Sequence, residues 1–171
     1  HPLQNNSQGR PIQVDFVIKN KYDKTAQWEF AIETKWIGNS DITLTDFIWD
    51  LIRLQNLFST NTNVKCYFLI AGNHKKIINF IENNSTNKND PSKKIISSGT
   101  KGTIFNLNNL KDTDKNNIND KFGKYKKFKL YSKINCGIIY QYPKDNVYNM
   151  SFGTFLIEVL NPNIEFEVKN L

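Results

Sequence analysis

Residues 12–37, IQVDFVIKNKYDKTAQWEFAIETKWI, decide the fold that we expect for this chain. Apolar and polar side chains alternate over residues 12–19 and 25–37, where β-branched and aromatic residues are abundant. Such alternation predicts two strands. Residues 20–24, NKYDK, are typical of a turn. The stretch therefore predicts a β-hairpin.

The second strand of this hairpin separates apolar from charged side chains. Residues two apart in a strand point to the same side. We expect Trp28, Phe30 and Ile32 to form the stripe that faces the core. Glu33 and Lys35 then emerge together on the opposite face, about 6.5 Å apart along the strand.

The first strand brings a second carboxylate, because a turn centred near Lys24 pairs Asp15 with Glu33. Two carboxylates so close repel each other unless a cation lies between them. Mg²⁺ suits such a pair, since it prefers oxygen ligands and keeps several waters, and Mn²⁺ could substitute for it. Lys35 could orient a metal-activated water or stabilise the charge that develops on a phosphate. The three residues together predict a site that cleaves a phosphodiester.

Other interpretations of these residues stay open. Glu29 lies on the same predicted face and could replace Glu33 at the metal or simply be exposed. Glu33 and Lys35 could form a surface ion pair worth under about 1 kcal/mol. That interpretation leaves Asp15 unexplained, because aspartate is disfavoured within strands and here interrupts an apolar run.

Further elements are predicted downstream of the hairpin. Apolar spacing predicts a helix over 44–58, capped by Thr43 with Asp46, and an apolar run predicts a strand over 64–71, buried on both faces. The remaining predictions are a short helix at 74–82, a polar loop at 83–101, a strand at 103–107, a Lys-rich helix at 114–128, and strands at 130–142, 152–160 and 164–169.

Residues 12–72 resemble the core of the PD-(D/E)XK nuclease superfamily. The resemblance rests on Asp15, on Glu33-Thr34-Lys35 at the end of an apolar strand, and on the helix and strand that follow. It implies a restriction-endonuclease-like α/β core with a mixed central sheet flanked by helices. It also implies that Asp15, Glu33 and the Thr34 carbonyl bind the metal, and that Lys35 is the catalytic lysine. Val14 stands where the family often has Pro. The family's first helix and strand would have to lie upstream of His1, unless the fold is permuted or the site is incomplete.

The positive charge of the chain is concentrated in one stretch. Residues 84–132 hold eleven Lys against four Asp, whereas twelve basic residues balance twelve acidic ones elsewhere, which leaves the net charge of +7 in this stretch. A polyanion-binding surface has this character, and so does a solvated lysine-rich face in a chain rich in Asn, Lys and Ile.

Residues 121–131, KFGKYKKFKLY, interleave lysines with aromatic residues. We expect Lys124, Lys126 and Lys127 to bind phosphates. The aromatic rings at positions 122, 125 and 128 could stack on bases, or bury one side of a helix. Arg53 could contact a phosphate, brace a carboxylate, or pair with Asp50 one helical turn away.

Composition narrows the class of protein. Cys66 and Cys136 lie in apolar runs, which favours buried free thiols in a reducing compartment over a disulfide. Two His and no CxxC motif argue against a zinc enzyme. No run of 18 apolar residues predicts a membrane span. We expect a cytoplasmic protein with no membrane attachment and no small-molecule cofactor.

We therefore expect a nuclease-like core over 1–82, a flexible polar loop over 83–101 and a basic α+β portion packed on the core over 102–171. The expected function is Mg²⁺-dependent hydrolysis of DNA, in a restriction or other defence role, by a chain that could form a homodimer. Two alternatives remain: an inactive nuclease-fold module that binds nucleic acid, and a non-enzymatic interaction or assembly protein.

Overall fold

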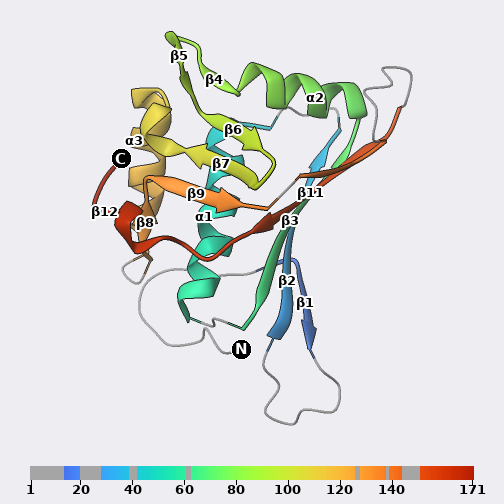
Figure 1. Ribbon diagram of the computed structural model, residues 1–171, viewed down its shortest axis with the longest axis horizontal. Coiled ribbons are helices and arrows are strands. Elements are labelled where there is room, and N and C mark those ends of the chain that lie inside the picture. The colour runs from blue at the N-terminus through green and yellow to red at the C-terminus, as the bar shows by residue number, and fades with distance from the viewer. Residues whose placement is uncertain are drawn as a thin grey trace.

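A mixed β-sheet organises the computed structural model, which describes residues 14–19, 28–38, 42–60, 63–125, 128–137, 139–143 and 151–171. Seven of its eight strands follow the order β1-β2-β3-β11-β9-β7-β6, and β10 pairs with β11 (Figure 1). β2 and β3 run parallel, and the other neighbours are antiparallel. The strands are β1 Phe16–Lys19, β2 Trp28–Ile37, β3 Lys65–Gly72, β6 Ile96–Gly99, β7 Gly102–Asn106, β9 Lys133–Cys136, β10 Tyr140–Tyr142 and β11 Gly153–Val159.

In the described part of the chain three α-helices accompany this sheet: α1 Leu44–Thr60, α2 His74–Asn83 and α3 Asp112–Phe122. α1 connects the parallel strands β2 and β3, as a crossover helix must. Its predicted cap is confirmed, because the Asp46 amide donates to Thr43 Oγ1 and the Thr43 hydroxyl donates to Asp46. The expectation of an α/β protein with a mixed central sheet and flanking helices is thus confirmed.

Residues 83–101, expected to be a polar loop, contain three strands. β4 Thr86–Asn87 pairs with β5 Asp90–Lys94, and β6 forms the last strand of the main sheet. The strand pattern in this segment is weak because the residues of β5 and β6 are almost wholly exposed and polar. Ile95, which lies between the two strands, is buried. β6, β7, β9, β10 and β11 join β1–β3 in one sheet, so the predicted core and the C-terminal portion share it.

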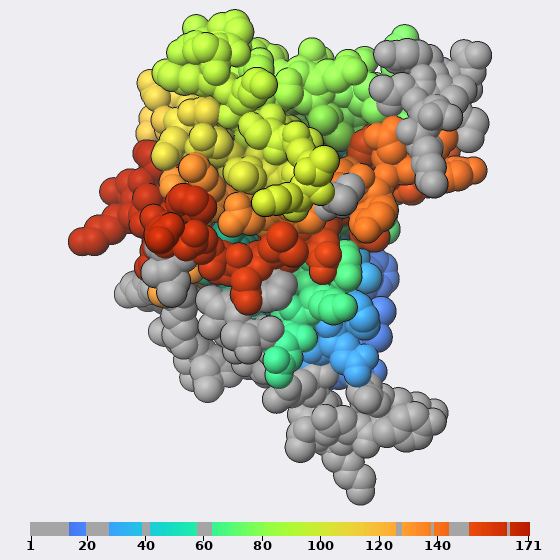
Figure 2. Space-filling model, in the orientation of Figure 1, coloured from blue at the N-terminus to red at the C-terminus, as the bar shows by residue number. Residues whose placement is uncertain are grey.

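The other short elements lie near the C-terminus and around α3. β8 Leu130–Tyr131 pairs with β12 Glu167–Val168, and two 3₁₀ helices span Leu107–Asn109 and Ile164–Phe166. α3 ends at Phe122, six residues before the predicted end of the Lys-rich helix. In Figure 2 the residues of the last strands (orange and red) lie between those of β5–β7 and those of β2–β3.

The core lies between the sheet and α1. Phe68 of β3 is fully buried and meets the Phe47 ring of α1 edge-on at 5.1 Å between centroids. β3 buries only one face, since Tyr67 and Leu69 are partly exposed, so the prediction of a strand buried on both faces was wrong. Cys66 and Cys136 are buried free thiols, as predicted.

The predicted orientation of β2 was also wrong. Ala31, Glu33 and Ile37 face the core, while Trp36 on the other side is 66% exposed. α1 packs on the face that bears Glu33, and the apolar stripe with Phe30 points away. Which face a crossover helix covers is not encoded in the alternation of the strand itself.

A β-bulge explains why Trp28 is nevertheless buried. Ile18 pairs with Phe30 and Lys19 pairs with Trp28, so Glu29 is an extra residue in β2. An extra residue reverses the alternation on one side of the bulge. Trp28 therefore points to the core although Phe30 does not.

Candidate active site

Glu33 is the most deeply buried carboxylate of the predicted site, with 6% of its surface exposed. Its Oε1 accepts a hydrogen bond from Arg53 Nη1 at 2.9 Å, whereas its Oε2 is buried without a hydrogen-bond partner. Burial raises the pKa of Glu33 to about 7; Arg53 opposes this rise, and the charges of Asp50 and Asp15 add to it. A carboxylate with one unpaired buried oxygen is suited to bind a cation.

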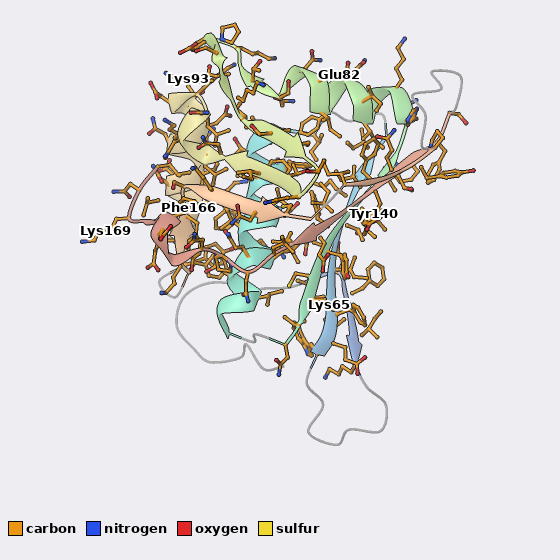
Figure 3. All side chains as sticks on the ribbon, in the orientation of Figure 1. Lys65, Glu82, Lys93, Tyr140, Phe166 and Lys169 are labelled. Carbon is orange, nitrogen blue, oxygen red and sulfur yellow. The ribbon has the colours of Figure 1, made fainter. Side chains whose placement is uncertain are left out.

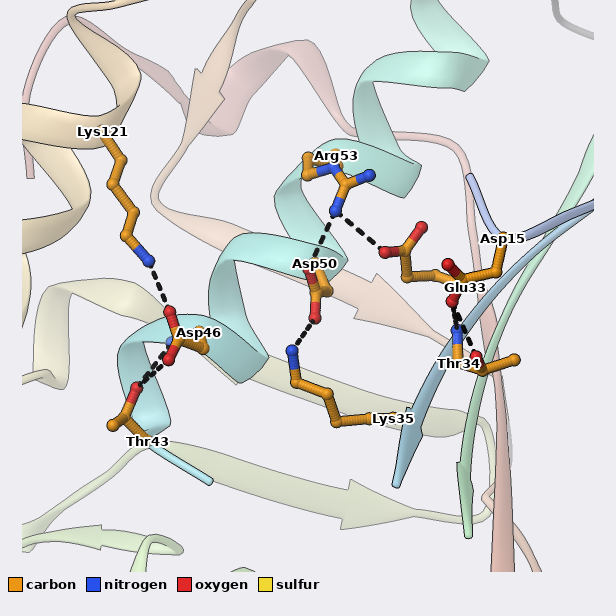
Figure 4. Close-up of polar contacts among 9 residues, drawn as sticks. All are labelled: Asp15, Glu33, Thr34, Lys35, Thr43, Asp46, Asp50, Arg53 and Lys121. Atoms are coloured by element: carbon orange, nitrogen blue, oxygen red, sulfur yellow. Dashed lines mark hydrogen bonds and ion pairs between the residues drawn. The ribbon is translucent and has the colours of Figure 1, made fainter. Parts of the chain in front are cut away.

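Asp15 lies at the bend that precedes β1, close enough to Glu33 for its charge to raise the pKa of that residue (Figure 4). The pairing of Phe16 with Ile32 brings the two strands into this register. Asp15 Oδ2 accepts hydrogen bonds from the Thr34 amide at 2.8 Å and from Thr34 Oγ1 at 2.7 Å. The Asp15 carboxylate thus accepts the Thr34 amide proton beyond the last residue pair of β1 and β2, and these two hydrogen bonds hold it at the Glu33-Thr34 segment.

Lys35 and α1 complete a network of charges on the same face of β2. Lys35 Nζ lies 2.8 Å from Asp50 Oδ2, and Asp50 Oδ1 lies 3.1 Å from Arg53 Nη1. Arg53 also contacts Glu33, so one guanidinium bridges two carboxylates. Two acids and two bases therefore balance each other beneath α1 (Figure 4).

The open question about Arg53 is answered in part by this network. The structure shows both the brace on the Glu33 carboxylate and the pair with Asp50. Both helix residues point to β2 because they lie one turn apart on α1, where residues three apart share a face.

Asp50, which the sequence suggested only as a helical partner of Arg53, is a further residue of this network. It is buried, with 5% of its surface exposed. The available signal was its position three residues before Arg53 in the helix that directly follows Glu33-Thr34-Lys35.

Glu29 lies outside this network. It is exposed and sits at the bulge, whereas Glu33 occupies the buried position below α1. The interpretation in which Glu29 replaces Glu33 therefore has no structural support.

The aromatic residues near the basic segment are packed against α1. The Tyr125 and Phe128 rings lie 5.3 and 5.9 Å from Trp49 and 4.8 Å from each other. They pack one side of this segment against the core, as one of the two interpretations predicted, although both residues lie beyond the end of α3 and not on a helix. Lys124 is exposed, and Lys126 and Lys127 lie outside the described residues.

The residues present fit a small hard cation held by few protein ligands. Asp15 and Glu33 supply two neighbouring carboxylates, and Glu33 Oε2 is unpaired. Within the described ranges no cluster of three or more His, Cys, Asp or Glu residues could hold a metal. Mg²⁺ commonly uses one or two carboxylates and fills its remaining positions with water.

Comparison with protein-family models, with curated proteins and with solved structures found no match to this chain. None of the helices within the described part of the chain is long and apolar enough to cross a membrane.

Proposed function

We propose that this protein is a Mg²⁺-dependent nuclease that hydrolyses phosphodiester bonds in DNA. The observation that carries the proposal is that Thr34 holds the Asp15 carboxylate close enough to Glu33 to raise its pKa, while Glu33 Oε2 is buried and unpaired on the strand that also bears Lys35. The resemblance of these positions to a restriction-endonuclease-like core supports it. The Thr34 carbonyl would be the third protein ligand in this proposal.

The metal, held by Asp15 and Glu33, would polarise the phosphate and acidify a water molecule. Side chains of the protein would position the metal ligand Glu33 and the catalytic Lys35. Arg53 holds one oxygen of Glu33 and leaves the other available. Asp50 fixes the Lys35 ammonium, which remains 30% exposed and can approach a phosphate oxygen.

Nicking of supercoiled plasmid DNA in the presence of Mg²⁺ tests this proposal. Asp15→Asn, Glu33→Gln and Lys35→Met should each lower the rate on the order of 100-fold or more, as loss of one charged catalytic group does. Glu29→Gln is the matched control, because it removes an exposed acid from the same strand. Far-UV circular dichroism checks that each variant folds. Undiminished nicking by Glu33→Gln, or equal loss in Glu29→Gln, would refute the assignment.

An inactive module that binds nucleic acid is the second candidate. The balanced charges of Glu33, Lys35, Asp50 and Arg53 favour it, because such a network also serves a purely structural role. This candidate predicts DNA binding that weakens with salt, without cleavage at any Mg²⁺ or Mn²⁺ concentration.

The basic segment is tested separately through the salt dependence of DNA binding. Changing Lys124, Lys126 and Lys127 together to Ala should weaken binding and reduce its salt slope by up to about three charge equivalents. An unchanged slope would remove this segment from the DNA surface.

A further inference from the structure

The side of the sheet away from α1 bears a broad apolar surface. β-sheet pairing aligns Phe16, Ile32 and Tyr67 across β1, β2 and β3. The outward residues of β1, β2, β3, β11 and β10, whose places in the sheet can be followed in Figure 1, form this surface, here called the outer patch. Its members lie at positions 16, 18, 30, 32, 34, 36, 65, 67, 69, 71, 140, 142, 154, 156 and 158.

Two more alignments make the outer patch continuous. Leu69 of β3 pairs with Leu156 of β11, which pairs with Tyr140 of β10. At one end Trp36 lies 6.0 Å from Phe152, between ring centroids. Because neighbouring strands lie about 4.8 Å apart, these side chains adjoin each other across the strands.

Four aromatic rings alone bring the exposed apolar area of the outer patch towards the upper end of the range for a monomer. Trp36 and Tyr140 are each 66% exposed, Tyr142 is 62% exposed and Phe16 is 58% exposed. Figure 3 shows Tyr140 projecting from this side. With about 150–250 Å² per aromatic side chain, these four alone present on the order of 500 Å². A monomer's largest apolar patch is roughly 300–600 Å², and a stable interface buries about 800 Å² on each partner.

The charges of the outer patch identify the occupant. Lys65 and Glu158 are the only charged residues among its members, and their charges cancel, although the chain carries +7 and the Asp15 carboxylate borders the patch at Thr34. A polyanion such as a nucleic acid would need a surplus of basic side chains on this surface, and the patch has none. Glu158 pairs with Tyr67, two residues from Lys65, and no ion pair joins the two within the described part of the chain.

We propose that two copies of this chain associate face to face through the outer patch, about a twofold axis that sets Lys65 of each copy against Glu158 of the other. A twofold interface must be complementary to itself, and one Lys with one Glu on an apolar field meets that condition. The neutral patch also lets two strongly basic molecules meet with little repulsion between facing charges. The inference makes no use of the proposed DNA cleavage, although Thr34 at the margin of the outer patch also binds Asp15.

Sedimentation velocity of the full chain over a concentration series tests this inference. The wild type should become dimeric by about 100 µM, a modest affinity for an interface of this size. Association should strengthen as salt rises, because salt screens the repulsion between two basic copies. Trp36→Lys combined with Tyr140→Lys should remain monomeric, with its fold checked by circular dichroism.

Charge exchange between the two copies supplies the sharper test. Lys65→Glu alone and Glu158→Lys alone place like charges together and should each weaken dimerisation about tenfold. The two substitutions together should restore it. Lys94→Glu on exposed β5 is the matched control and should not weaken dimerisation.

Two results would overturn the proposal. One is a wild type that stays monomeric throughout the concentration series. The other is binding of a single-stranded oligonucleotide that the Trp36→Lys, Tyr140→Lys variant loses while the wild type stays monomeric, since this assigns the outer patch to nucleic acid.

Discussion

The two faces of strands β1–β3 differ in what their side chains contact. On the inner face Glu33 and Lys35 meet Asp50 and Arg53 of α1, and these charges pair with one another. On the outer face Trp36 and its neighbours are exposed and nearly free of charge. A sheet can place charged groups on its buried side when a covering helix supplies their partners.

The difference teaches that alternation in a strand identifies two faces without saying which is buried. The aromatic face of β2 would be the core face if only hydrophobicity mattered. The covering helix instead brings Asp50 and Arg53 to the face that bears Glu33, and buries the charges in pairs. The buried face of β2 is therefore the one against which the connecting helix α1 packs.

The largest expected effect is a difference in stability between losing a buried ring on the inner face and losing an exposed ring on the outer face. Phe68→Ala should lower the free energy of unfolding by about 3–5 kcal/mol, because Phe68 is fully buried and leaves a cavity. Trp36→Ala should cost under about 1 kcal/mol, because the ring is largely exposed. Urea unfolding at low protein concentration measures both. Equal losses would show that the outer face is covered.

The next effect concerns the two cations of the inner face. Arg53→Met should cost about 3 kcal/mol, because it leaves the buried carboxylates of Glu33 and Asp50 without their shared partner. Lys35→Met, which removes a more exposed partner of one carboxylate, should cost under about 1 kcal/mol. Adding Glu33→Gln to Arg53→Met should recover part of the loss. A larger cost for Lys35→Met would contradict the network.

The effect that is smallest over any single experimental step is a pH dependence of stability, because it is spread over several pH units. Burial raises the pKa of Glu33 from 4.5 to about 7, so the folded protein binds a proton there that the unfolded chain has lost. Stability therefore falls as pH rises from about 4.5 to about 7, by at most about 1.4 kcal/mol per pH unit. Glu33→Gln should remove this slope, and Glu29→Gln should retain it. Urea titrations across this pH range measure the difference, and identical slopes for all three proteins would contradict it.

Local sequence patterns were sufficient to predict the helices and strands around the site. The hairpin, α1 with its Thr43 cap, β3 and α2 all appear where the sequence predicts them. These elements depend on interactions between residues close in sequence, such as caps and helical spacing. The adjacency of Asp15 and Glu33 followed from the same hairpin, although the residues of its turn lie outside the described ranges.

Contacts between distant segments decided what local patterns could not. Residues 83–101 contain strands because β6 pairs with β7, which pairs with β9. The bulge at Glu29 depends on the partner strand, and the burial of Tyr125 depends on Trp49 of α1. The strands and the bulge leave no strong periodic signal in their own segments, whereas the three-residue spacing of positions 122, 125 and 128 did indicate a buried side.

The sequence by itself determined which chemical groups lie near one another along the first hairpin: Asp15, Glu33 and Lys35. The tertiary structure alone decided that this group is buried beneath α1 with Asp50 and Arg53, and that the aromatic face stays open. The physical reason is that spacing along a strand is local, whereas burial depends on which other segments pack against it.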